Sequence, residues 1–220
     1  PLPTNPIASS YLVPGFYVTD AGDGAITPQF YPLHPVWLAI AFALSTSHVE
    51  GIYAELLMAG LWMTLGALAI YLTMREIAGR TTAVLALIAL SLAALQVWFA
   101  RYSATEALTQ YLLWAGLWGS VMWLGGRRPS SLWAFLTGIM LGSVFLVRID
   151  VLIMLPIFIL LIVALWARGW RKSDYWFLIP FAALVVHSFV HAVWLSAPYF
   201  YEHIGFGLRI LWRSWLVPMA

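Results

Sequence analysis

The chain has 220 residues, of which 63% are hydrophobic and only 9% are charged. A soluble domain carries charge on about 25% of its residues, so this composition excludes a soluble globular protein and indicates a multi-pass membrane protein. The net charge of +2 comes without a basic run, which argues against nucleic acid as a partner. The absence of cysteine excludes disulfides, thiolate nucleophiles and cysteine-ligated metal sites.

The N-terminal stretch, residues 1–32, is rich in turn-forming residues and contains two acids, Asp20 and Asp23. This composition predicts an ordered but irregular loop outside the membrane. The apolar stretch that follows, within 33–47, has about ten residues and is too short to cross a bilayer. With Trp37 at headgroup level, it predicts an interfacial or re-entrant helix.

From residue 48 to residue 220 the chain is predicted to form a transmembrane helical domain. Six apolar segments bounded by charges are long enough to span a bilayer, at approximately 52–74, 81–99, 107–125, 131–147, 151–167 and 175–197. A seventh segment, near 204–217, is broken by two arginines. We therefore predict an all-α bundle with six or seven spanning helices. The chain ends suggest a fragment of a larger protein.

Basic residues sort to one face of this predicted bundle. That face collects Arg75, Arg80, Arg127, Arg128, Arg168, Arg171 and Lys172. By the positive-inside rule it is cytoplasmic, which predicts a cell (inner) membrane protein with residues 1–51 on the outer side. The connections at 100–106 and 148–150 fall on the same outer side. Their charges are mixed in sign, which membrane orientation does not require.

Arg148 and Asp150 stand at the junction of predicted helices 131–147 and 151–167, where almost no loop separates the helices. Two interpretations stay open. The residues are either a local pair that caps two helix ends, or a cation that faces an anionic ligand, with Asp150 holding its orientation. Ionisable groups at membrane depth are functional hypotheses by default.

The polar loop at 100–110 carries Arg101 and Glu106. They are five residues apart, so they do not form a favourable i, i+4 pair on one helix, and each is free to face another group. Glu106 ends the sequence Ser-Ala-Thr-Glu, which has the form of a capping box. It either caps the next helix, or acts as a general base on a hydroxyl acceptor or binds a metal.

Three other ionisable residues fall inside predicted helices. Glu55 is either a buried neutral acid bonded to a neighbour or an orienting member of a site. His187 and His191 are four residues apart, a spacing that suits two metal or haem ligands, but no third ligand accompanies them. Packing across the bundle is the alternative, and we predict no metal site. The pair Gly138 and Gly142 forms a GxxxG pattern of small packing residues.

The order of these features resembles a family of membrane enzymes. An outer loop with acids is followed by a Tyr-Pro-Leu-His-Pro helix start at Tyr31, by Met-Arg-Glu76 at the end of a span, by Arg-Tyr-Ser-Ala-Thr-Glu106 and by Val-Arg-Ile-Asp150. This order is similar to that of the C-type integral-membrane glycosyltransferases, including the aminoarabinose and protein mannosyl transferases. The resemblance covers about residues 13–165 and rests on loosely spaced patterns.

The resemblance implies transfer of a sugar from a polyprenyl-phosphate donor to an acceptor at the outer membrane face. Family members carry an essential acid soon after their first spanning helix. That helix is missing here, so we expect the principal acid upstream of Pro1, with Asp20 and Asp23 as catalytic substitutes. Glu106 matches the acid of the family's second outer loop. Arg148 matches a basic residue at the family's helix junction.

In such a reaction Arg101 and Arg148 would bind the leaving phosphate, and Glu106 or an upstream acid would deprotonate the acceptor hydroxyl. No cofactor is firmly implied, and a divalent metal ion is the one candidate. The expected partners are the membrane, a polyprenyl-phosphate lipid and other membrane subunits. The competing interpretation is a non-catalytic multi-pass helical subunit of a larger membrane complex.

Overall fold

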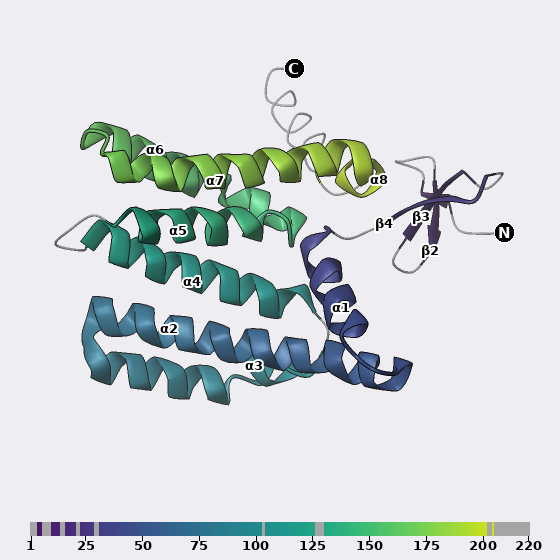
Figure 1. Cartoon of the computed structure of the whole chain (residues 1–220), viewed down its shortest axis with the longest axis horizontal. Helices are drawn as coiled ribbons and strands as arrows, with labels where there is room; N and C mark the ends of the chain where they lie inside the picture. Colours follow the sequence, from purple (N-terminus) through teal and green to yellow (C-terminus); the bar gives the residue numbers. More distant parts are fainter. Residues whose placement is uncertain are drawn as a thin grey trace, which may run out of the picture. The chain divides into compact units, whose positions relative to one another are not determined.

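A computed structural model describes the chain in residues 4–5, 10–13, 16–20, 23–28, 31–102, 104–125, 130–201 and 204. The chain divides into two compact units, one within residues 1–31 and 187–220 and the other within residues 32–186. Apart from one small sheet, the described elements are helices, which confirms the predicted all-α bundle (Figure 1).

The N-terminal segment contains four short antiparallel strands in the order β1-β2-β3-β4, namely β1 (Thr4–Asn5), β2 (Ser10–Val13), β3 (Phe16–Asp20) and β4 (Ala25–Pro28). Tyr11 pairs with Val18, which pairs in turn with Ile26. The predicted irregular loop is therefore wrong for these residues. The turn formers separate short runs of β-branched and aromatic residues, a pattern of hairpins, and Gly24 takes the left-handed φ of 71° that the last turn requires.

Helix α1 (Leu33–Ala43) confirms the short apolar helix predicted within 33–47. Its 11 residues are about 16 Å long, well short of a bilayer. The backbone N–H of Leu33 donates to the carbonyl of Leu146 at 3.0 Å, which fixes the start of α1 to the end of the α5 region. Trp37 packs edge-on against Trp62 of the next helix, with ring centroids 5.4 Å apart.

Helix α2 (His48–Leu92) begins with a hydrogen-bonded cap and is two helices joined at Gly79. The hydroxyl of Ser47 accepts from the N–H of Glu50, whose carboxylate accepts from the hydroxyl and the N–H of Thr46. These hydrogen bonds lower the pKa of Glu50, and the bond from the Thr46 hydroxyl has the largest effect. Gly79 has a φ of 86°, a left-handed value that glycine adopts without a steric clash. Figure 1 shows α2 doubling back on itself.

The predicted continuous helix 81–99 is wrong. The return limb of α2 ends at Leu92, Ala93 is extended with a ψ of 118°, and a separate helix α3 (Ala94–Phe99) follows. The hydroxyl of Ser91 donates to the carbonyl of Leu87 at 2.8 Å, a back-bond that favours bending of the helix just before the break. The amide of Gln96 donates to the sulfur of Met63 at 3.0 Å and holds α3 against α2.

The remaining described elements of the chain are all helices. The elements are α4 (Thr105–Gly125), α5 (Ser131–Val144), the 3₁₀ helix η1 (Ile149–Met154), α6 (Leu155–Ala167), α7 (Lys172–Val190), the π-helical segment η2 (His191–Leu195) and α8 (Ala197–Phe200). In the larger unit, α4 packs between α2 and α5 (Figure 1).

Three helical stretches are long and apolar enough to cross a membrane, Tyr53–Leu92, Ile149–Ala167 and Lys172–Leu195. They support a membrane protein. Helix α4 is about 31 Å long, but residues such as Thr105, Glu106 and Gln110 make it less apolar. Six or seven spans therefore stay a prediction. Of the predicted seventh segment, only Ile204 lies within the described residues.

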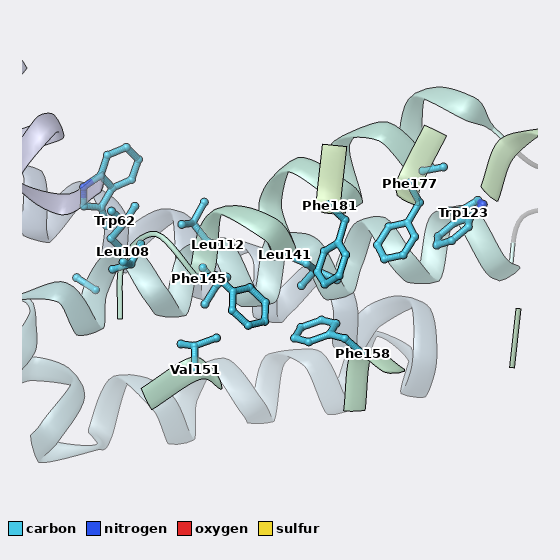
Figure 2. Close-up of a cluster of buried hydrophobic side chains, with 14 of the residues drawn as sticks. Trp62, Leu108, Leu112, Trp123, Leu141, Phe145, Val151, Phe158, Phe177 and Phe181 are labelled. Atoms are coloured by element: carbon cyan, nitrogen blue, oxygen red, sulfur yellow. The ribbon is translucent and has the colours of Figure 1, made fainter. Parts of the chain in front are cut away.

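The core of the larger unit combines aliphatic side chains with a group of aromatic rings (Figure 2). The rings of Phe145, Phe158 and Phe181 face one another, with centroids 5.1 to 6.0 Å apart. Trp123 of α4 stacks on Phe177 of α7 at 5.0 Å. These contacts join α4, the end of α5, α6 and α7 around one buried cluster, which positions the α5–η1 junction described below.

Close helix packing in this unit depends on glycines. A Cβ on Gly138 would lie 2.4 Å from the carbonyl oxygen of Phe177, and a Cβ on Gly142 would lie 3.2 Å from the Cα of Phe181. The GxxxG pattern thus packs α5 onto α7 within the chain. On the other face of α5, the side chain of Leu141 fills the space beside Gly116 of α4.

Replacing Gly138 by alanine is expected to destabilise the protein by about 1–3 kcal/mol, because the new methyl overlaps a backbone carbonyl and the two helices must shift apart. Denaturant unfolding in detergent micelles measures this loss. Gly125→Ala is the matched control, since a Cβ there meets no atom of the described residues within 4 Å. Equal stability of the two variants would show that α5 and α7 separate without cost.

Candidate functional site

The candidate site is built at the junction of α5 and η1. Helix α5 ends at Val144, and Arg148 takes an extended conformation with φ −144° and ψ 139° before η1 begins. Val147 and Ile149, on either side of Arg148, are both buried. In an extended segment neighbouring side chains point to opposite sides, so anchoring these two apolar residues directs the arginine away from the core.

Arg148 binds two carboxylates that come from different parts of the chain. Its Nε and Nη2 donate to the two oxygens of Asp150, each at 2.9 Å, in a fork geometry. Its Nη1 forms an ion pair with Oε1 of Glu106, which is 42 residues away in the first turn of α4. Nη1 also donates to the hydroxyl of Thr105 at 3.4 Å. We call Thr105, Glu106, Arg148 and Asp150 the acid–arginine cluster.

The acid–arginine cluster is partly open to its surroundings. The side chains of Arg148, Glu106 and Asp150 are 29%, 35% and 53% exposed. One guanidinium balances only one of the two carboxylates, so the cluster keeps a net negative charge. The hydrogen bond to Asp150, and then the bond to Glu106, raise the pKa of Arg148 against the opposing effect of burial. The guanidinium is therefore charged at every physiological pH.

The geometry allows two chemical actions. Glu106 is half-exposed and held in place by Arg148 and by the hydroxyl of Thr105, which is 3.4 Å from its Oε2, so it can accept a proton from a bound hydroxyl. Arg148 has five N–H donors, and the two carboxylates and Thr105 take most of them. An anionic ligand would therefore have to displace a carboxylate to make a forked contact.

The other predicted site residues lie elsewhere. Asp20 ends β3 and Asp23 is exposed in the following turn, so both belong to the smaller unit. Glu55 is half-buried on α2, and Arg101 is exposed after α3. Among the contacts described for the larger unit, none joins Glu55 or Arg101 to the acid–arginine cluster. The structure brings together Glu106, Arg148 and Asp150.

The two histidines end in different environments. His187 is exposed, while His191 is buried, with its Nε2 3.2 Å from the hydroxyl of Ser196. The His191 ring lies 6.0 Å from that of Tyr31, whose pKa is raised to about 12, chiefly by burial. No group of three His, Cys, Asp or Glu side chains in the described chain could hold a metal ion.

Sequence reasoning missed two residues. The sequence pattern predicts Thr105 only as part of a capping box, whereas its hydroxyl bridges Arg148 and Glu106. Asp174 is fully buried, and it accepts from Nη2 of Arg168 and from the N–H of Arg171, each at 2.8 Å. The sequence signal for Asp174 is an acid in the first turn of a predicted helix, directly after a basic stretch. A negative side chain there is stabilised by the positive end of the helix dipole. This pair holds the α6–α7 turn.

Two apolar clefts flank the α2–α4 pair. One, of about 210 Å³, opens between α2, α4 and α5, with Tyr111, Trp118 and Trp133 in its wall. The other, of about 520 Å³, lies between α2 and α4 near Trp114 and Gly125. Neither is lined by the acid–arginine cluster. Both present hydrocarbon surface, which suits lipid chains rather than polar solutes.

Fold and site together describe a helical membrane protein with an acid–arginine cluster at a helix junction. Comparisons with family models, with curated proteins and with solved structures found no match. The function is therefore argued from the residues and their geometry.

Proposed function

We propose that the protein is a membrane glycosyltransferase that moves a sugar from a polyprenyl-phosphate donor to an acceptor at the outer face of the cell membrane. The observation that carries the proposal is the contact between Glu106 and Arg148. A proton acceptor and a guanidinium, from segments 42 residues apart, meet at a partly exposed point beside a helix junction. Both are groups that glycosyl transfer from a phosphate requires.

Each residue has a defined task in this reaction. Glu106 takes the proton of the acceptor hydroxyl while the acceptor oxygen bonds to the anomeric carbon. The bond from that carbon to the phosphate oxygen breaks, and polyprenyl phosphate leaves. Arg148 stabilises the charge that grows on the phosphate. Asp150 holds the guanidinium in the fork geometry until the phosphate replaces it.

A lipid carrier also needs a place for its tail. The cleft between α2, α4 and α5 begins at Tyr111, five residues along α4 from Glu106 and thus about 7.5 Å along the helix axis. Its lining is almost entirely apolar. A hydrocarbon chain lying there would place its phosphate near the cluster. This arrangement supports a lipid-linked donor over a soluble sugar nucleotide.

The proposal includes an orientation. The basic connections, with Arg75, Arg80, Arg168 and Arg171, lie in the cytoplasm, and the acid–arginine cluster lies at the opposite, outer end of six or seven spans. In this orientation the donor is presented to the cluster from the outer leaflet. Residues 1–51 are placed on the same side.

The test is transfer by the whole chain in nanodiscs supplied with labelled polyprenyl-phosphate sugar and membrane acceptors. Wild type is expected to transfer label, and Arg148→Ala is expected to lose transfer while still inserting in the membrane. Arg75→Ala is the control, because that arginine pairs with Glu76 on an exposed surface. Absence of transfer in wild type, or wild-type rates in Arg148→Ala, overturns the proposal.

A second candidate is a non-catalytic subunit of a membrane complex. One observation favours it: Arg148 already has carboxylate partners within its own chain, as a structural clamp between α4 and η1 would. In this case Arg148→Ala lowers stability, and partner chains co-purify with the wild type. Transfer by the purified chain alone excludes this candidate.

A further inference from the structure

The break at Ala93 separates the return limb of α2 from the short helix α3. Residues 80–92, before the break, are about 20 Å long, and α3 is about 9 Å long. Neither alone reaches across a hydrocarbon core of about 30 Å, but the two in line do. Gln96 of α3 bonds to Met63, and the carbonyl of Ala100 lies beside Gly60, so α3 continues along the first limb of α2 and residues 98–102 stand at the end of the return path.

The side chains of this segment are suited to the boundary between hydrocarbon and water. Trp98 is 58% and Tyr102 is 48% exposed, and their ring centroids are 4.7 Å apart. Leu95, one turn earlier, is also exposed. Tryptophan and tyrosine concentrate at headgroup level because each ring is apolar at one end and polar at the other.

Arg101 stands between these aromatic residues in the sequence and is exposed. Arg75, Arg148 and Arg168 each bind a carboxylate, but no described residue forms an ion pair with Arg101. An exposed guanidinium at the boundary between hydrocarbon and water attracts a phosphate anion, and its aliphatic stem can stay on the apolar side of that boundary.

We propose that residues 98–102 form an interfacial anchor in which Arg101 binds the headgroup phosphate of an anionic bilayer phospholipid. The opposite charges of guanidinium and phosphate identify the ligand, and the exposed Trp98 and Tyr102 identify the depth. The inference is separate from glycosyl transfer, because it concerns lipids of the bilayer and not a donor substrate. It gives Arg101 a role outside the acid–arginine cluster.

The depth of the anchor is measured with spin labels, for which the chain is convenient because it has no cysteine. A label at Tyr102→Cys in nanodiscs is expected at headgroup level by collision with oxygen and with a soluble nickel complex. A label at Ile88→Cys, exposed within the return limb of α2, is the deep control. A Tyr102 label as deep as the Ile88 label, or one fully in water, overturns the proposal.

The ligand is tested by native mass spectrometry of the protein from nanodiscs of phosphatidylglycerol or phosphatidylcholine. Arg101→Gln is expected to retain about fivefold less phosphatidylglycerol, the effect of one basic residue at an anionic surface, and the same amount of phosphatidylcholine. Arg75→Gln, whose charge Glu76 already partners, should match wild type. Unchanged retention in Arg101→Gln, or equal losses of both lipids, contradicts the assignment.

Discussion

Replacing Glu106 by glutamine is expected to lower the rate of sugar transfer about 10²–10⁴-fold, the usual contribution of a general base. Glutamine keeps the shape of the side chain and still accepts a hydrogen bond from Arg148, but it does not take a proton from an acceptor hydroxyl. The substitution therefore removes the proposed chemistry with little change in packing. Initial rates with labelled donor in nanodiscs measure the effect.

The matched control for this experiment is Glu76→Gln, an acid that pairs with Arg75 on an exposed part of α2. It should transfer sugar at the wild-type rate. Affinity for the donor should change little in Glu106→Gln, because the donor phosphate is assigned to Arg148. A Glu106→Gln variant with wild-type turnover removes this residue from the mechanism, whatever the state of Arg148.

Much of the helical architecture could be predicted because apolar segments between charges have few alternatives to a helix in lipid. The segment predicted at 107–125 corresponds to α4, and the short predicted helix corresponds to α1. The break at Ala93 could not be predicted, since Leu-Ala-Ala-Leu is compatible with a continuous helix. There the contact between Gln96 and Met63 is tertiary and leaves no local signal.

For the N-terminal strands, turn residues were a misleading signal. Proline, glycine and asparagine favour loops, but they also separate the strands of a meander. The strands themselves are short, as in β3 (Phe16–Asp20), and such short runs are easily overlooked. Strand pairing, as between Val18 and Ile26, supplies the hydrogen bonds that decide the outcome.

The candidate site was predictable to different degrees. Arg148 and Asp150 are two residues apart at a helix junction, so their pairing is local. The partner of Glu106 is 42 residues away, and only the packing of α4 against α5 brings it into contact. Arg101 shares a loop with Glu106, but it follows α3, where its backbone N–H donates to the carbonyl of Trp98. Nearness in sequence therefore did not decide which charges meet.

Replacing Arg168 by alanine is expected to destabilise the protein by about 3 kcal/mol, because it leaves the fully buried carboxylate of Asp174 without its cation. This value is at the low end for a broken buried pair, since Arg168 itself is 29% exposed and the N–H of Arg171 still binds Asp174. Thermal unfolding in detergent at neutral pH measures the loss.

Two variants separate this effect from the mere loss of a surface charge. Arg75→Ala removes an equally short ion pair, 2.7 Å long, but both of its partners are over a third exposed, so it should cost no more than about 1 kcal/mol. Asp174→Asn removes the buried charge and keeps an oxygen for the Arg171 N–H, so it should be less harmful than Arg168→Ala. If Arg168→Ala and Arg75→Ala unfold at the same temperature, burial of Asp174 does not make its arginine essential. The α6–α7 turn would then be held by its backbone and apolar contacts alone.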